Sequence, residues 1–196
     1  MKRCMSPAGS TLVEVLFVST LVVTLTGIAV PQALVALDDV RAAGAARYVS
    51  ARLQRARMEA VMRSADVAIR FTSTAAGYSY AAYVDGNRNG VRAAEISKGI
   101  DREVAPSERL SDKFACADFA TLPNLPAVDS GGTPPGTDPV RLGSSNMASF
   151  SALGTGSTGT LYIRCGNAQY AIRIYGETGK TRILRFDLRA RRWNPL

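Results

Sequence analysis

The chain has 196 residues, a formal net charge of +8 at neutral pH and no histidine. The lack of histidine excludes Ser-His catalytic triads, histidine metal sites and histidine acid-base catalysis. Neither a P-loop nor a dinucleotide-binding glycine motif occurs. We therefore expect a protein that is not an enzyme and has no catalytic residue, no cofactor and no metal site. The length fits one membrane anchor followed by one domain of ordinary size.

An apolar segment runs from Leu12 to Leu37 and is long enough to cross a bilayer as a single helix. Glu14 is the only charged residue within it. A carboxylate in a lipid-soluble helix is costly unless it has a partner, so Glu14 is a candidate functional residue. Because Lys2 and Arg3 precede the segment, the positive-inside tendency predicts that the chain after it lies outside the inner membrane.

The residues before the apolar segment do not have the order of a secretory signal. In such a signal the small residues of the cleavage site follow the apolar region, whereas here Gly9 and Ser10 precede it. Cleavage between them would make Glu14 the fifth residue of the mature chain. This pattern resembles that of type IV prepilins and type II secretion pseudopilins. The alternative is an ordinary signal anchor that carries an isolated glutamate.

The resemblance implies processing and assembly roles for three residues. It implies that a prepilin peptidase removes residues 1–9 as a leader by cutting after Gly9, and that the new amino group of Ser10 is methylated. The family usually has phenylalanine where this chain has Ser10. The resemblance also implies that Glu14 pairs with the amino terminus of a neighbouring subunit during filament assembly. Low-dielectric surroundings would strengthen such a charge pair.

We expect one long helix that changes character along its length. Residues 10–37 are the transmembrane and filament-core part, and residues 38–64 continue it as an amphipathic helix. Pro31 stands where major pilins commonly have a helix-breaking proline, so it predicts a kink or a locally melted segment near residues 27–31. Apolar residues at helical spacing predict a stripe that packs on a sheet, and they are Val49, Leu53, Ala56 and Ala60.

The rest of the chain, residues 65–196, is expected to form a β-rich domain. Runs of alternating and β-branched residues predict strands at residues 67–71, 78–84, 95–104, 149–153, 159–165, 169–175 and 181–188. Gly166 and Asn167 predict a tight hairpin between two of these strands. The predicted fold class is therefore α+β, with the long amino-terminal helix packed on a carboxyl-terminal antiparallel sheet or sandwich, as in pilins.

A polar loop from Asp85 to Gly90 follows the second predicted strand. It places oxygen-bearing side chains at alternate positions, which suggests calcium. An EF-hand loop needs an acid at its twelfth place, however, and this chain has Ile96 there. Asx and glycine residues also form turns without a metal, which is the interpretation we adopt. Further along, we expect Asp101 and Glu103 to be solvated.

Segments of the predicted helix, sheet and loop resemble the FimT/GspH family of minor pilins and pseudopilins. The helix end Leu53–Ala60, the Asp-x-Asn-x-Asn-Gly loop and the final Gly-x-x-Arg strand carry the resemblance. It implies a minor pilin or pseudopilin that assembles into a type II secretion pseudopilus or a type IV pilus and supports protein secretion or pilus biogenesis. The implied partners are other pilins of the filament, the prepilin peptidase and an inner-membrane assembly platform.

Cysteine usage agrees with a periplasmic domain on a single-pass inner-membrane anchor. Cys4 would leave with the leader, and Cys116 and Cys165 could then form one disulfide in an oxidising compartment. The alternative is two separately buried thiols.

The carboxyl-terminal part of the chain is strongly basic. From Arg173 onward, seven basic residues stand against two acidic ones. The sequence Gly179-Lys180-Thr181-Arg182 resembles the Gly-Arg-x-Arg motif with which FimT-type minor pilins bind DNA in natural transformation. DNA binding is thus the alternative function, against a solvated basic strand or a subunit interface. Its candidate residues are Lys180, Arg182, Arg185, Arg189, Arg191 and Arg192.

Overall fold

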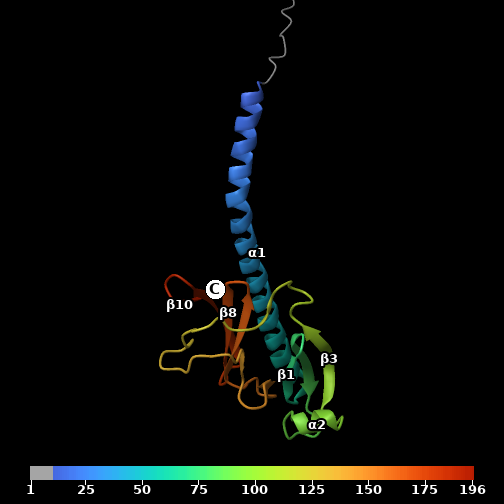
Figure 1. Cartoon of the computed structure of the whole chain (residues 1–196). Helices are drawn as coiled ribbons and strands as arrows, with labels where there is room; N and C mark the ends of the chain where they lie inside the picture. The colour runs from blue at the N-terminus through green and yellow to red at the C-terminus, as the bar shows by residue number, and fades with distance from the viewer. Residues whose placement is uncertain (1–10) are drawn as a thin grey trace, which may run out of the picture. The chain divides into compact units, whose positions relative to one another are not determined.

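The computed structural model describes residues 11–196, which form two helices and ten strands (Figure 1). By its internal contacts the chain divides into two units, with the boundary between Leu37 and Asp38. The elements are α1 (Leu12–Arg63), β1 (Val67–Thr74), β2 (Gly77–Val84), α2 (Ala93–Ser97), β3 (Arg102–Arg109), β4 (Asp118–Phe119), β5 (Val140–Arg141), β6 (Met147–Phe150), β7 (Gly159–Cys165), β8 (Ala168–Tyr175), β9 (Lys180–Asp187) and β10 (Arg192–Pro195).

The first unit is the apolar part of α1. Residues 11–37 are all exposed, and the helix is long and apolar enough to cross a membrane, with a mean hydropathy of 2.2 in its most apolar window. Its serine and threonine hydroxyls donate to main-chain carbonyls one turn earlier, as Ser19 does to Val15 at 2.7 Å. Each hydroxyl is thereby satisfied within the helix, which suits a segment without access to water. The α-helix continues through Pro31, so residues 27–31 are helical and not melted; the kink stays a prediction.

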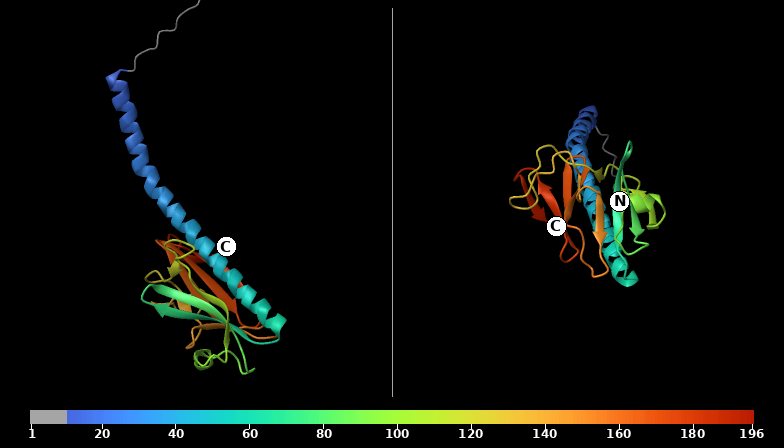
Figure 2. Two further views of the ribbon diagram at one scale, coloured as in Figure 1. Left: turned by 90° about the vertical axis from the view of Figure 1, so that its right-hand side faces the viewer. Right: turned by 90° about the horizontal axis from the view of Figure 1, so that it is seen from below.

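The second part of α1 forms the centre of the domain core. The predicted stripe is confirmed, because Val49, Leu53, Ala56 and Ala60 are all buried. Several further buried positions on this helix are alanines, whose small side chains allow the helix to lie close to the strands. Figure 2 shows this part of α1 running along the strands. The amphipathic pattern therefore determines which side of the helix the domain covers.

Two antiparallel sheets make up the β-domain. One has four strands in the order β3-β2-β1-β6, and the other has the order β10-β9-β8-β7-β4 with β5 also pairing with β7. Both sheets contribute buried side chains to one core with α1, for example Phe71 from β1 and Ile172 from β8. The α+β fold class expected from the sequence is confirmed. The predicted hairpin at Gly166 and Asn167 is confirmed as well, since β7 ends at Cys165 and β8 begins at Ala168.

The six-stranded sheet carries a second, smaller core on its other face. Tyr162 and Phe186 are buried there, and Trp193 of β10 packs on both rings with centroid separations of 5.9 and 5.1 Å. Leu122 and Leu125 of the long loop cover the same cluster. This outer face is therefore apolar at one end, and the loop between β4 and β5 lies over it.

Two strand predictions need correction, and three short strands were not predicted. The strand expected over residues 95–104 is wrong, because residues 93–97 form helix α2 and the strand β3 begins only at Arg102. The strand expected at residues 149–153 is β6, which begins at Met147 and ends at Phe150. Strands β4, β5 and β10 had no counterpart among the predictions, since they have only two to four residues and their places depend on pairing with β7 or β9.

Asp101 was expected to be solvated, and this prediction is also wrong. Its side chain is 2% exposed. The carboxylate accepts hydrogen bonds from the main-chain N–H groups of Gly86 at 3.2 Å and Arg92 at 2.8 Å. The burial is compensated because both oxygens have donors, and together these bonds join the Asp85 loop to the start of β3.

Cys116 and Cys165 form a disulfide with their Cα atoms 5.1 Å apart. Cys116 lies in the segment after β3, and Cys165 ends β7. The bond therefore ties the chain leaving one sheet to a central strand of the other.

Candidate functional site

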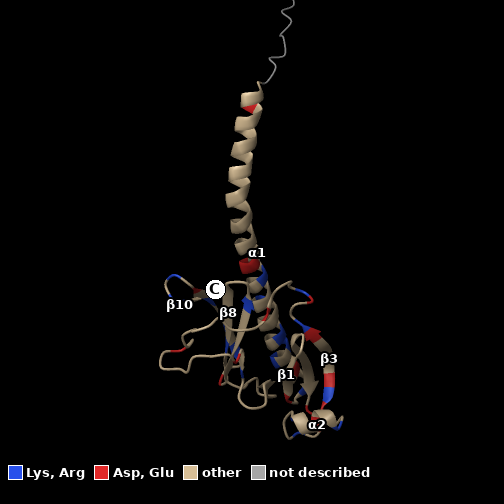
Figure 3. Ribbon diagram, in the orientation of Figure 1, with Lys and Arg blue, Asp and Glu red and all other residues tan. Residues whose placement is uncertain are grey.

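Glu14 stands alone in the charge pattern of α1. Figure 3 shows one acidic position near the beginning of the helix and no further charged residue before the acidic pair at residues 38 and 39. The Glu14 N–H donates to the Oγ1 atom of Thr11 at 3.3 Å, and an acid in a first helical turn interacts favourably with the helix dipole. Within residues 11–196 its carboxylate forms no ion pair. The predicted cleavage and methylation residues, Gly9 and Ser10, lie outside the described residues.

Asp39 connects the first turn after the apolar segment to the six-stranded sheet. Its carboxylate accepts a hydrogen bond from the Tyr170 hydroxyl at 3.0 Å and pairs with Arg185 at 3.2 Å. Burial, together with the nearby Asp39 carboxylate, raises the pKa of Tyr170 to about 12. Arg185 thus has a structural partner on α1.

The neighbouring Asp38 carboxylate lies near the disulfide sulfur atoms, with the three potential ligand atoms within 4.8 Å of one another. A cysteine binds a metal well only as a thiolate, and the sulfur atoms of Cys116 and Cys165 are bonded to each other. In the form with the disulfide, this group of residues is unsuited to hold a metal ion.

The six residues proposed for DNA binding do not form one surface. Successive side chains of a strand point to opposite faces, so Lys180 and Arg182 lie on the outer face of β9, while Arg185 lies on the face toward α1. Arg189, Arg191 and Arg192 lie in and after the turn that follows β9. The guanidinium of Arg191 donates to the carbonyl of Asn124 at 2.6 Å.

A row of arginines on the outer face of the six-stranded sheet was not among the sequence predictions. Strand register places Arg173 directly opposite Arg182, and Thr160 between Arg173 and Arg141, so that three arginines lie in one row across four strands. Like charges in such positions repel each other. Within the described part of the chain, Asp129 is the only carboxylate that pairs with the row, at 2.6 Å from Arg173. The row is therefore a local excess of positive charge.

The loop considered for calcium is organised by main-chain hydrogen bonds. Asp85 is 8% exposed, and its Oδ1 atom accepts hydrogen bonds from the N–H groups of Asn87 and Arg88, each at 2.9 Å. Its Oδ2 atom accepts from the N–H of Gly90 at 2.7 Å, and Gly90 has a φ of +84°. The side-chain amide of Asn87 donates to Glu95 at 3.3 Å. Both oxygens of Asp85 thus already accept hydrogen bonds from the main chain, as in Asx turns.

Comparison with known families decides the classification of the chain. The family model described as type II transport protein GspH matches residues 45–178. The chain belongs to the GspH family. The match extends from the buried part of α1 to the turn before β9, so it includes the four-stranded sheet and strands β4, β5, β7 and β8 of the other sheet, and it ends just before Lys180. No curated protein and no solved structure matched the chain.

Family membership confirms the FimT/GspH resemblance inferred from the sequence. It supports a role as a pseudopilin or minor pilin in general, which is a structural role in an assembly with other pseudopilins. The apolar helix fits a single-pass membrane anchor in such a protein.

A polar cluster around Glu108 attaches α1 of this GspH-family chain to β3. The Glu108 carboxylate accepts a hydrogen bond from the Tyr48 hydroxyl at 2.6 Å and pairs with Arg52 at 3.2 Å and Lys113 at 3.5 Å. Burial by itself would raise the pKa of Glu108, but the Tyr48 hydrogen bond and the two cations outweigh it and lower the pKa. The folded state therefore favours the ionised form of this side chain.

This lowered pKa predicts a pH-dependent contribution to stability. Because the folded pKa lies below the unfolded one, the contribution is complete above the unfolded value of about 4.3 and is lost as the pH falls through the folded value. We expect Glu108→Gln to lower the free energy of unfolding by about 2 kcal/mol at pH 7. The difference should shrink progressively below about pH 4. Urea unfolding of both proteins at neutral and acidic pH measures it.

Glu59→Gln is the matched control, because Glu59 pairs with Arg63 on the exposed side of the same helix at 2.9 Å. Exposed pairs of this kind contribute little to stability. A loss for Glu108→Gln that is the same at pH 7 and at acidic pH would contradict the assigned ionisation.

Proposed function

We propose that the chain is a minor pseudopilin that leaves the inner membrane to join a filament, either a type II secretion pseudopilus or a type IV pilus. The observation that carries the proposal is Glu14, the only charge in an otherwise apolar and exposed helical segment. A residue so unfavourable in lipid is explained if assembly supplies its partner. Membership of the type II transport protein GspH family favours the secretion filament.

The proposed role of α1 follows from its surface. Its apolar side chains are equally suited to lipid and to the helical core of a filament, and its hydroxyls are bonded within the helix. Transfer of the helix from lipid to the filament therefore breaks no hydrogen bond of its hydroxyl groups, and Glu14 is the polar group whose surroundings change. Pairing of Glu14 with the amino group of Ser10 in a neighbouring subunit would then determine the axial position of the new subunit.

In this proposal the leader of residues 1–9 is cut off by a prepilin peptidase after Gly9, and Ser10 is methylated. The domain from Asp38 onward lies in the periplasm, where an oxidising environment supports the disulfide. The assembly platform of the inner membrane would draw processed subunits into the filament.

Processing tests the prepilin assignment directly. Gly9→Leu is expected to abolish cleavage, because the peptidase motif depends on the glycine before the cut. The mass of the chain recovered from membranes of a host with a prepilin peptidase should then include residues 1–9. Ala8→Leu is the matched control and should be processed normally. The same mature mass for Gly9→Leu and the unchanged chain would refute the assignment.

DNA binding remains the second candidate function. Of its six residues, Lys180 and Arg182 share the outer face of β9, where Arg173 lies directly opposite Arg182. Three cations on one face would suffice for contacts with a few phosphates but not for sequence reading. Titration of the full chain with a short DNA duplex at low ionic strength tests this function, and no binding would refute it.

A further inference from the structure

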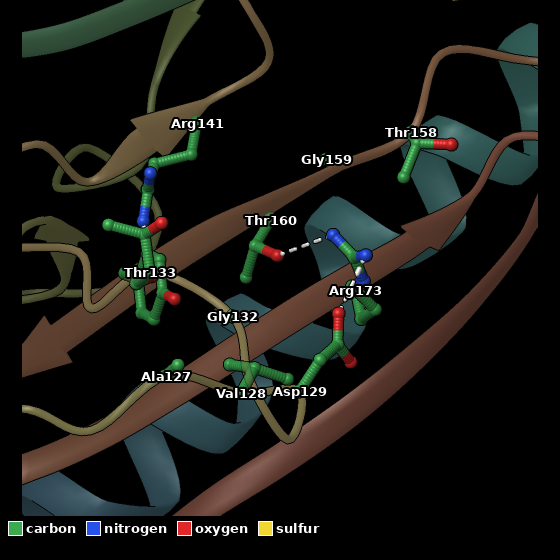
Figure 4. A pocket seen from close by; sticks show the side chains of 11 residues that line it. Ala127, Val128, Asp129, Gly132, Thr133, Arg141, Thr158, Gly159, Thr160 and Arg173 are labelled. Atoms are coloured by element: carbon green, nitrogen blue, oxygen red, sulfur yellow. Dashed lines mark hydrogen bonds and ion pairs between the residues drawn. The ribbon is translucent and has the colours of Figure 1, made fainter.

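A pocket of about 250 Å³ lies over the arginine row, between the outer face of the six-stranded sheet and the loop of residues 127–133 (Figure 4). Arg141 of β5 and Arg173 of β8 line it. Thr160 of β7 and Thr158, which precedes β7, line it as well. Asp129 enters it from the loop. The pocket is large enough for one small acidic group and borders the smaller apolar core, to which Tyr162 belongs.

Several hydrogen-bond donors of the two pocket arginines are unused. Arg141 uses one terminal nitrogen for the carbonyls of Thr133 and Pro134, and within residues 11–196 its other two guanidinium nitrogens form no hydrogen bond. Arg173 donates to the Thr160 hydroxyl at 3.2 Å, and its buried Nε atom has no acceptor among the residues that the structure describes. Buried donors without acceptors are uncommon in folded proteins. A further oxyanion in the pocket would use this capacity.

Asp129 shows which chemistry the pocket accepts. Its carboxylate lies 2.6 Å from the Arg173 guanidinium, which is the arrangement of an arginine with an acidic ligand. The Asp129 side chain is 46% exposed and belongs to a surface loop, whereas the Arg173 side chain is 21% exposed and belongs to a central strand. The arginine is thus held in place by the sheet, whereas the aspartate can move away with its loop.

The charge of the lining favours a monoanion. Two arginines and one aspartate leave a single positive charge in the pocket. A single carboxylate balances that charge, and one that takes the place of Asp129 at Arg173 leaves the charge of the pocket as it is. Tyr162 also lines the pocket, and burial raises the pKa of its hydroxyl, so it is neutral at pH 7 and can donate a hydrogen bond.

We propose that this pocket binds a carboxylate side chain of a partner protein, with Arg173 and Arg141 as the binding residues and Asp129 as an internal ligand that the partner displaces. The internal carboxylate competes with the external one, so it limits affinity in the free protein. The proposal does not depend on which filament the chain joins, nor on cleavage after Gly9.

Binding of an acidic peptide to the full chain in neutral detergent micelles tests the proposal. The probe is a tetraglutamate peptide with blocked ends, measured by titration calorimetry at low ionic strength. Tetraglutamine, inorganic phosphate and a short DNA duplex are the comparison probes. We expect the glutamate peptide to bind and the glutamine peptide not to bind.

Two variants of the pocket are expected to have opposite effects on the affinity for the glutamate peptide. Asp129→Asn should tighten binding of the glutamate peptide by about tenfold, because it removes the competing carboxylate. Arg173→Gln should weaken binding by about tenfold or more, the effect of losing a charge-assisted hydrogen bond. The charge-matched controls are Asp112→Asn and Arg164→Gln, which lie outside the pocket and should change affinity less than about twofold.

Three outcomes would overturn the proposal. The first is no peptide binding by either the unchanged chain or Asp129→Asn, a variant that keeps the arginines in place. The second is an equal loss of affinity in Arg173→Gln and Arg164→Gln, which would show unspecific attraction to positive charge. The third is tight DNA or phosphate binding that the glutamate peptide cannot displace. Binding by Asp129→Asn alone would support the proposal, with Asp129 closing the site in the free protein.

Discussion

Replacement of Glu14 by valine is expected to leave the chain in the inner membrane but to remove it from filaments. The helix without its only charge is more compatible with lipid, so insertion should be unimpaired. In an assembled filament, however, the amino group of the neighbouring subunit would lose its partner in surroundings of low dielectric constant. An unpaired charge there is strongly unfavourable.

We expect the amount of Glu14→Val in sheared filaments to fall by about tenfold or more relative to the unchanged chain. The measurement is the ratio of this subunit in the filament fraction to that in the inner-membrane fraction, determined by quantitative immunoblotting. Glu14→Gln should behave like Glu14→Val, because the amide keeps the shape but not the charge. Glu14→Asp should retain part of the incorporation.

Val18→Ala is the control for changes to the apolar surface of the same helix, since Val18 lies one turn after Glu14 and is exposed. It should incorporate normally. Equal incorporation of Glu14→Val and the unchanged chain would contradict the docking role of this carboxylate. It would leave the family assignment intact, because the match to that family covers only residues 45–178.

Loss of the disulfide should produce the second large effect. Cys116 and Cys165 are separated by 49 positions in the sequence, and closing a loop of this length in the unfolded chain corresponds to about 4 kcal/mol of stabilisation. We expect the double variant Cys116→Ala with Cys165→Ala to lose about this much free energy of unfolding. Urea unfolding monitored by circular dichroism measures the difference.

Reduction of the unchanged chain provides an independent arm of the same experiment. A reductant should shift its unfolding midpoint toward that of the double alanine variant and should leave the variant itself unaffected. A midpoint of the unchanged chain that does not respond to complete reduction would contradict a stabilising role of the bond. The segment after β3 would then be held by its other contacts alone.

Local patterns in the sequence predicted most of the secondary structure. The spacing of Val49, Leu53, Ala56 and Ala60 predicted the buried side of α1, because helical periodicity alone decides which side chains share a face. Gly166 and Asn167 predicted a two-residue turn from local chemistry alone, because glycine accommodates a positive φ, and Gly166 has a φ of 56°. These features depend on residues that are close in the chain.

The errors occurred where distant residues decide the outcome. The charged stretch at the start of β3 resembles a solvated strand. The Asp101 carboxylate is nevertheless buried, because the N–H groups of Gly86 and Arg92 donate hydrogen bonds to it. Strand β10 is held by the packing of Trp193 on Tyr162 and Phe186, which no local pattern reveals. In both cases the contact that compensates an unfavourable or weak local choice comes from another part of the chain.

The sequence by itself determined the apolar helix with its single charge, the α+β class and the GspH family, because each depends on composition, on short periodicities or on contiguous motifs. Only the tertiary structure decided how the basic residues are distributed. Strand register brings Arg141, Arg173 and Arg182 into one row, and side-chain alternation sends Arg185 to the opposite face and to Asp39. Register is a relation between paired strands and not within one strand, and it is fixed by the shared core that those strands bury.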